Sequence, residues 1–255
     1  MRDQPYYSVR TGKNTAGATF ELAMLLKLFK SLFEQLSENG YFQQSFGYYC
    51  VDSRDVPGSL GSDVNGIIML ELHKDNLWPI LGKCLEYSED DLFDVIEFLY
   101  DNVSKPTDGY LHSYGGCGYH YSAFNREDGQ TEFRTRINRL LGAYKVAQEL
   151  LPNGEVVTKA DPGLEELLNV DLPVTGAARV DSRIHAAIAK FRRHRSSFQD
   201  RRDAIRDLAD VLEFMRPRLK TVLTTSDEAD LFNIANNFGI RHYNQKQKTD
   251  YDEAI

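Results

Sequence analysis

The residues best suited to acid–base chemistry lie near the C-terminus, in the stretch ANNFGIRHYN at positions 235–244. Arg241 and His242 are adjacent there. Histidine titrates near neutral pH, and an arginine guanidinium can hold phosphate oxygens with two donors. The pair therefore suits metal-independent cleavage of a phosphodiester, with His242 as general acid/base and Arg241 as phosphate clamp. We expect Asn237 and Asn244 to orient the substrate.

The backbone around this pair decides whether the two side chains can work together. Neighbouring residues on a helix point about 100° apart, so Arg241 and His242 on one rigid helix would not converge on one phosphate. Gly239 can end the helix just before them, or two chains can each supply one side chain. The alternative is purely structural: His242 and Asn244 bond a helix end, and Arg241 forms a salt bridge.

A second set of reactive residues lies in the middle of the chain. His112, Cys117 and His120 have the spacing H-x4-C-x2-H and are all good zinc ligands, with Asp108 as a fourth candidate. An aromatic loop packed on the core explains the same residues. The chain has three widely spaced cysteines and no CxxC, which argues against a disulfide scaffold and favours inert thiols. We predict no cofactor and no metal, and keep zinc at these three residues as an alternative.

Positive charge is concentrated in one segment. Residues 179–202 carry eight Lys or Arg against Asp181 and Asp200, a net charge of +6 in a chain of −8, so the remaining residues carry −14. Such a segment can attract nucleic acid or an acidic partner, although a solvated helix face is the alternative. We predict an RNA-binding track formed by five arginines: Arg192, Arg193, Arg195, Arg201 and Arg202.

The elements that must position these residues are mostly helices. Apolar residues recur at helical spacing over residues 18–38, 88–105 and 131–151, and again over 182–198 and 200–215, with a further helix from Ser226. Ser88 and Asp91 have the spacing of a capping box, and Asn153-Gly154 predicts a hairpin turn. Residues 67–72 suit either a strand or a helix, and residues 108–130 read as a long aromatic and glycine-rich loop.

The overall composition is that of a globular protein. The chain has 255 residues, of which 42% are hydrophobic and 27% charged. We predict a mainly α fold in two parts: an N-terminal mostly helical domain at 1–157 with a small β element, a linker at 158–178, and a C-terminal helical bundle at 179–255. There is no long apolar run and no signal-peptide pattern at the N-terminus, so we expect a cytoplasmic protein that does not enter a membrane.

The C-terminal helices also resemble a known family. The stretch IHAAIAKFRRHRSSFQDRRDAIRDLADVLEFMRPRLK, followed by DLFNIANNFGIRHYNQKQKTDYDEAI, resembles the HEPN superfamily (higher eukaryote and prokaryote nucleotide-binding) of prokaryotic abortive-infection and phage-defence proteins. The likeness covers about the last 80 residues best and extends loosely to residues 131–157. In active members, the arginine is followed four to six positions later by a histidine, whereas here His242 directly follows Arg241.

This resemblance implies a HEPN-like C-terminal bundle and a role in prokaryotic defence. Active family members are metal-independent ribonucleases that pair two sites across a dimer, so the resemblance implies RNA cleavage or RNA binding. The expected partners are RNA and either a second copy of the chain or a partner defence protein. The alternative is a non-catalytic HEPN-like subunit that dimerises or scaffolds a partner effector.

Overall fold

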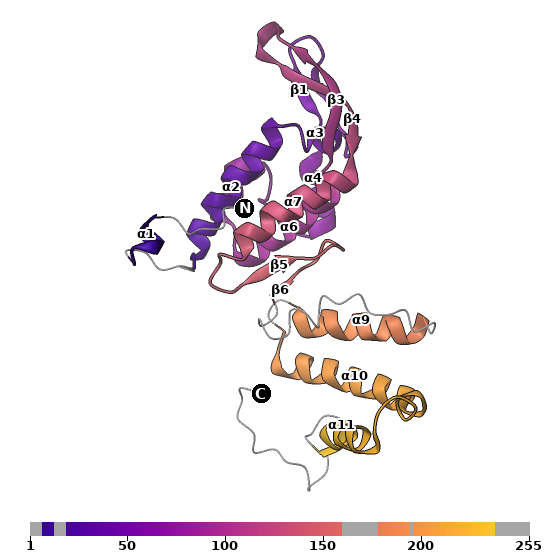
Figure 1. The fold of residues 1–255 in the computed structure, drawn as a ribbon. Coiled ribbons are helices and arrows are strands. Elements are labelled where there is room, and N and C mark those ends of the chain that lie inside the picture. The colour runs from indigo at the N-terminus through magenta and orange to yellow at the C-terminus, as the bar shows by residue number, and fades with distance from the viewer. Residues whose placement is uncertain (1–6, 13–18, 160–177, 194–195, 238–255) are drawn as a thin grey trace. The chain divides into compact units, whose positions relative to one another are not determined.

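A computed structural model describes residues 7–12, 19–159, 178–193 and 196–237 (Figure 1). The chain divides into two compact units, Met1–Val156 and Val157–Ile255, which are treated separately below. Helices make up most of the described residues, and the strands form small two-stranded sheets. This confirms the predicted mainly α fold with a small β element. None of the described helices combines the length and the apolar character needed to span a membrane.

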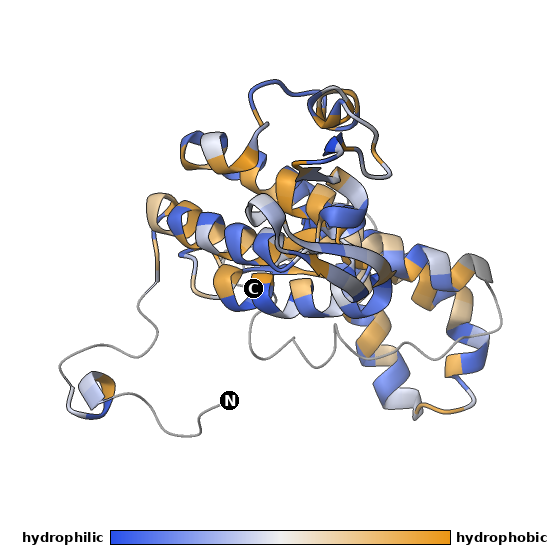
Figure 2. Ribbon diagram, turned by 90° about the horizontal axis from the view of Figure 1, so that it is seen from above, coloured by the Kyte–Doolittle hydropathy of each residue, from blue (hydrophilic) through white to orange (hydrophobic). Residues whose placement is uncertain are grey.

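The first unit is built on three long helices. Buried apolar side chains from each of them form one core, in which residues such as Phe29, Ile96 and Phe133 are almost completely excluded from solvent. Figure 2 shows hydrophobic and hydrophilic residues alternating around the helices, as amphipathic packing requires. The described helices of this unit are α1 (Tyr7–Arg10), α2 (Leu22–Glu38), α3 (Gln43–Phe46), α4 (Val64–Leu72), α5 (Ile80–Lys83), η1 (Cys84–Glu86), α6 (Glu89–Asn102), η2 (Tyr114–Gly116) and α7 (Arg126–Leu141).

Local signals fix several of these helix ends. Ser88 and Asp91 form the predicted capping box at the start of α6, in which the Ser88 hydroxyl accepts the Asp91 N–H at 3.2 Å. The stretch at 67–72 is helical, because Asp63 accepts the Gly66 N–H at 2.9 Å and so starts α4. The predicted helix at 18–38 begins only at Leu22, and two residues of its apolar repeat, Met24 and Leu28, are exposed.

The described strands form three two-stranded sheets. β1 (Tyr48–Cys50) pairs antiparallel with β2 (Arg54–Val56), and β3 (Lys105–His112) pairs antiparallel with β4 (Gly118–Asn125). β5 (Gln148–Leu150) pairs with β6 (Val156–Thr158). Between β5 and β6, Leu151 N–H donates to the Glu155 carbonyl at 2.9 Å, and Gly154 has a φ of 93°, which confirms the predicted Asn153-Gly154 turn.

The prediction of a loop at residues 108–130 is wrong. This segment contains most of the β3–β4 hairpin and the beginning of α7. Its glycines suggested a loop, but Gly109 lies where a side chain would collide with the backbone of His120 and Tyr121 across the hairpin. Here a glycine permits close packing of two strands instead of breaking one.

The middle of the hairpin is tied to the helices by one side chain. Gln43, on α3, receives the Tyr121 N–H at 2.6 Å and donates to the Tyr119 carbonyl at 3.0 Å. Its amide thereby satisfies two backbone groups of β4 in the way that a neighbouring strand would. At the base of the hairpin, Gly129 of α7 packs against the backbone of Ser104 and Lys105. The hairpin therefore projects from the helical core in a defined direction.

Both predicted bounds of the helix at 131–151 are also wrong. α7 starts at Arg126, where Asn125 accepts the Asp128 N–H at 3.1 Å, and stops at Leu141. The chain then turns back as β5. Asn138 receives the Leu150 N–H at 2.6 Å and donates to the Leu150 carbonyl at 3.0 Å. This two-way bond with the returning chain stabilises a strand where apolar periodicity suggested a continuous helix.

The second unit contains three described helices: α9 (Ala178–Arg192), α10 (Phe198–Leu219) and α11 (Thr225–Asn237). Ion pairs join the first two, with Lys190 Nζ at 2.9 Å from Asp207 and Arg183 at 3.5 Å from Asp210. α10 runs past Met215 and includes Pro217, which the sequence placed beyond the helix. α11 is capped by Thr224, which accepts the Asp227 N–H at 3.2 Å, and not by Ser226 as expected.

Candidate metal centre

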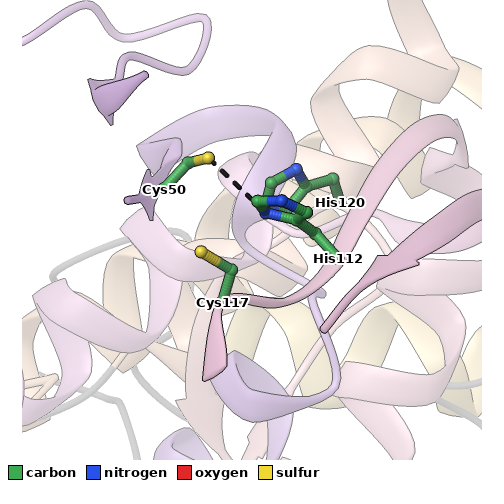
Figure 3. Close-up of side chains that lie close together, drawn as sticks. All are labelled: Cys50, His112, Cys117 and His120. Atoms are coloured by element: carbon green, nitrogen blue, oxygen red, sulfur yellow. Dashed lines mark hydrogen bonds between the residues drawn. The ribbon is translucent and has the colours of Figure 1, made fainter. Parts of the chain in front are cut away.

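Four potential metal ligands meet where the β1–β2 and β3–β4 hairpins come together. They are Cys50 at the end of β1, His112 at the end of β3, Cys117 in the turn, and His120 on β4. One ligand atom from each residue lies within 4.8 Å of the other three. Figure 3 shows the two sulfur atoms and the two imidazole rings gathered around a common centre. Two thiols and two imidazoles form the donor set typical of a tetrahedral zinc site.

The spacing between a thiol and an imidazole fits such a site. Cys50 Sγ lies 3.7 Å from His112 Nδ1. With Zn–S of about 2.3 Å and Zn–N of about 2.0–2.1 Å in a tetrahedron, the two ligand atoms should be about 3.6 Å apart. The measured separation therefore leaves room for one zinc ion between them with little movement.

His120 provides the clearest sign that a partner is required. Its side chain is buried, with a fractional exposure of 4%, and its Nε2 atom is buried without a hydrogen-bond partner. The other ring nitrogen, Nδ1, lies 3.2 Å from the Tyr110 hydroxyl. A buried polar atom without a partner is costly, and coordination of a metal by Nε2 would remove that cost. Tyr110 would then hold the ring with Nε2 toward the ion.

His112 has the complementary arrangement. Its Nδ1 faces Cys50, while its Nε2 lies 3.3 Å from the Asp52 carboxylate. A carboxylate that accepts the outer N–H of a metal-bound histidine fixes the tautomer and the ring orientation, and it strengthens the ligand. Both histidines thus present one nitrogen to the cluster and have the other held by an oxygen.

Backbone amides also face the two thiols of the cluster. Backbone N–H groups of Ser53 and Asp52 lower the pKa of the Cys50 thiol, against the opposing effect of burial. The Val51 N–H donates to Cys117 Sγ at 3.2 Å. Because a metal binds the thiolate, amide donors directed at sulfur favour coordination.

The turn that carries Cys117 depends on glycine. Gly116 and Gly118 flank the cysteine with φ values of 73° and 85°, which L side chains rarely adopt. Gly115 also has a positive φ, and a Cβ there would lie 2.7 Å from Val51 on the facing hairpin. The sequence YGGCGYH therefore folds into a tight turn that brings the thiol against the β1–β2 turn.

The structure thus brings together the three zinc candidates of the sequence analysis and adds Cys50. The fourth candidate, Asp108, is not among the four clustered ligands, since its carboxylate accepts the N–H of the adjacent Gly109 at 2.8 Å. Cys50 was missed because it lies 62 residues before His112, and no local spacing connects the two. The prediction that its thiol is merely inert does not fit its position in this cluster.

Most of the predicted phosphodiester-cleaving residues lie outside the described part of the chain. This applies to Arg241, His242 and Asn244. Asn237 is the last residue of α11, where its exposed side chain bonds Asn233 one turn earlier. The described residues therefore do not place these four side chains relative to one another.

The predicted RNA track is only partly at the surface. Arg192 is buried at the end of α9, with a fractional exposure of 4%, and so does not line a surface for RNA. Arg193 and Arg201 are exposed and Arg202 is half-buried, whereas Arg195 lies outside the described residues. Earlier in the basic segment, Arg183 and Lys190 are paired with the aspartates of α10. The accessible positive charge is therefore smaller than the sequence count suggests.

We compared the chain with protein-family models, curated proteins and solved structures. No family model matches the chain, and neither the curated proteins nor the solved structures contain a significant match.

Proposed function

We propose that this chain is a zinc-binding protein and that Cys50, His112, Cys117 and His120 hold one Zn²⁺ ion in a structural centre. The observation that carries the proposal is the convergence of four ligand atoms within 4.8 Å, one of them the buried and unpartnered Nε2 of His120. Support comes from the outer partners Asp52 and Tyr110, which contact the ring nitrogens facing away from the cluster.

The donor set favours a structural role over a catalytic one. Catalytic zinc sites keep one position open for water or substrate, whereas structural sites fill all four positions with protein ligands. Here four side chains complete the shell. The ion would join two hairpins whose strands have few buried side chains, and its binding energy would add to the folding energy of this region.

The test is the zinc content of the purified protein and of two cysteine variants. We expect one zinc per chain in the wild type and a loss of at least about tenfold in zinc affinity in Cys50→Ala. Cys84→Ala is the matched control, because Cys84 is a free, buried cysteine of the helical core that lies outside the cluster. Equal zinc content in Cys50→Ala and Cys84→Ala, or none in the wild type, would contradict the proposal.

As a second function, we propose that the basic segment of the second unit binds RNA in a prokaryotic defence role, as the resemblance to HEPN proteins implies. The observation that favours it is the exposure of Arg193, directly after α9, and of Arg201, in the first turn of α10. In this proposal His242 and Arg241 cleave the bound RNA, and the alternative is a non-catalytic subunit that holds a partner.

Binding and cleavage can be measured separately. Arg201→Ala should weaken binding of single-stranded RNA and reduce its salt dependence, because losing a phosphate contact reduces the number of counterions that binding releases. Arg218→Ala is the control, because Arg218 is also exposed on α10 but lies outside the basic segment. His242→Ala should abolish cleavage and preserve binding. Retained cleavage in both His242→Ala and Arg241→Ala excludes the catalytic form, and no binding by the wild type excludes the RNA function.

A further inference from the structure

A cavity of about 460 Å³ lies in the first unit, between the β1–β2 hairpin and the start of α4. None of the four clustered cysteine and histidine residues lines it. Its volume falls in the range of small-molecule sites, which is about 300–1,000 Å³. The cavity and its lining residues lie entirely within described parts of the chain.

One part of the wall is aromatic. Phe46, Tyr48 and Trp78 all line the cavity. Phe46 and Trp78 meet edge to face, with their ring centroids 5.3 Å apart, and Tyr48 packs against His120, at 4.4 Å between centroids. These contacts hold the rings in place before any ligand arrives. Phe46 also stacks on Phe42 and Phe98, so the π faces offered to an organic cation are those of Tyr48 and Trp78.

The charges of the wall have one sign. Asp55 and Asp63 are among the lining residues, and no lysine, arginine or histidine is. Asp63 also caps α4 and is partly engaged by the Gly66 N–H, so Asp55 is the freer carboxylate of the two. Carboxylates beside aromatic rings favour a positively charged ligand over a neutral one of the same shape.

From this combination we infer that the cavity bounded by Phe46, Tyr48, Trp78 and Asp55 is a binding site for an alkylated ammonium group. Such a group is carried by free quaternary amines and by methylated lysine side chains, and both place a bulky cation on the end of a short chain. The ligand would contact none of the four metal ligands, and the cavity is linked to the cluster only through Tyr48, which packs on His120.

The chain itself supplies the reporter for a direct test, since Trp78 is its only tryptophan. Choline is titrated into the purified full-length protein while tryptophan fluorescence is recorded, and 3,3-dimethyl-1-butanol, its neutral isostere, is titrated in parallel. We expect a saturable change with choline and binding of the neutral isostere that is weaker by roughly tenfold. Equal responses to the two compounds, or no response to choline, overturn the inference.

A charge variant tests the electrostatic part. Asp55→Asn should weaken choline binding by about threefold or more. Asp101→Asn removes the same charge from a carboxylate whose side chain is 69% exposed and which does not line the cavity, and it should bind choline as the wild type does. Wild-type affinity in Asp55→Asn overturns the role of the carboxylate.

A third arm distinguishes the source of the cation. N-acetyl-trimethyllysine methylamide is compared with the unmethylated lysine analogue and with choline. Tighter binding of the trimethyllysine compound than of choline assigns the site to a methylated protein side chain, and the reverse order assigns it to a free quaternary amine. Preference for unmethylated lysine over both overturns the inference.

Discussion

At the residue scale, each histidine of the cluster has a defined inner and outer nitrogen. Tyr110 contacts the outer nitrogen of His120 at 3.2 Å, although the tyrosine side chain itself is largely exposed. The hydroxyl therefore positions a metal ligand without contacting the ion. Such outer partners contribute to metal affinity because they orient the ring and polarise the donor atom.

Removal of this hydroxyl should weaken zinc binding without unfolding the hairpin. We expect Tyr110→Phe to reduce zinc affinity about 10-fold, within the range found for outer-shell partners. Tyr119→Phe is the control, because Tyr119 is also exposed on the same hairpin and its ring stacks on Tyr121 instead of a histidine. Competition with a chromogenic chelator measures both affinities, and equal values would show that Tyr110 does not support the centre.

Three of the four clustered ligands could be predicted from the sequence, and the fourth could not. His112, Cys117 and His120 could be proposed together because they lie within nine positions, whereas Cys50 could not. Its place depends on how two hairpins pack, and that contact leaves no periodic or spacing signal. The two histidine partners, Asp52 and Tyr110, were equally hidden, since an isolated aspartate or tyrosine in a turn-rich segment has no distinctive pattern.

At the element scale, the β3–β4 hairpin is held at three points: its base on α7, its middle on Gln43, and its tip at the four-residue cluster. Only the last of these would depend on metal. The two strands have few buried side chains, so the tip has little apolar packing of its own. Loss of zinc should therefore loosen the tip first and leave the helical core folded.

Hydrogen exchange tests this division. When a chelator removes zinc, backbone amides of 48–56 and 110–120 should exchange at least about tenfold faster, because local opening needs less free energy. Amides of α6 should keep their protection, since their side chains form the core. An equal increase in exchange rate across the first unit after chelation would mean that the ion stabilises the whole unit. No increase at any amide would contradict a structural role for the ion.

The stability of the region at the base of the hairpin should depend on pH through the hydrogen bond between Tyr41 and Glu132. The Tyr41 hydroxyl donates to Glu132 on α7 at 2.6 Å. This bond lowers the pKa of Glu132 below its ordinary value, while burial, together with the same bond, raises the pKa of Tyr41 to about 12. A carboxylate with a lowered folded pKa contributes stability above its unfolded pKa, and that contribution disappears as pH falls through the folded value.

Tyr41→Phe should therefore cost more stability at neutral than at acid pH. We expect a loss of about 1.5 kcal/mol at pH 7, the scale of a hydrogen bond to a charged group, and a smaller loss at pH 3. Denaturant unfolding at the two pH values measures the difference. Tyr144→Phe provides a comparison, because the Tyr144 hydroxyl donates to a different carboxylate, Glu89, at 2.5 Å. An equal loss for Tyr41→Phe at both pH values would contradict the assignment.

At the scale of the whole molecule, the sequence predicted the helical character well and the β structure poorly. Helices with strong caps or long periodic faces were foreseen, such as α6 with its Ser88–Asp91 box. The β3–β4 hairpin was not, because its glycines serve close strand packing and a tight turn, and periodicity cannot distinguish those uses from a loop. The centre sits on the part of the fold that was hardest to predict.

The most direct test of the central claim is zinc X-ray absorption spectroscopy of the full-length protein as purified under reducing conditions. We predict one zinc per chain bound by two sulfur atoms at about 2.3 Å and two nitrogen atoms at about 2.0–2.1 Å. Cys50→Ala should lose one sulfur or lose the ion. A zinc-free protein, or zinc surrounded only by oxygen and nitrogen atoms, would contradict the account.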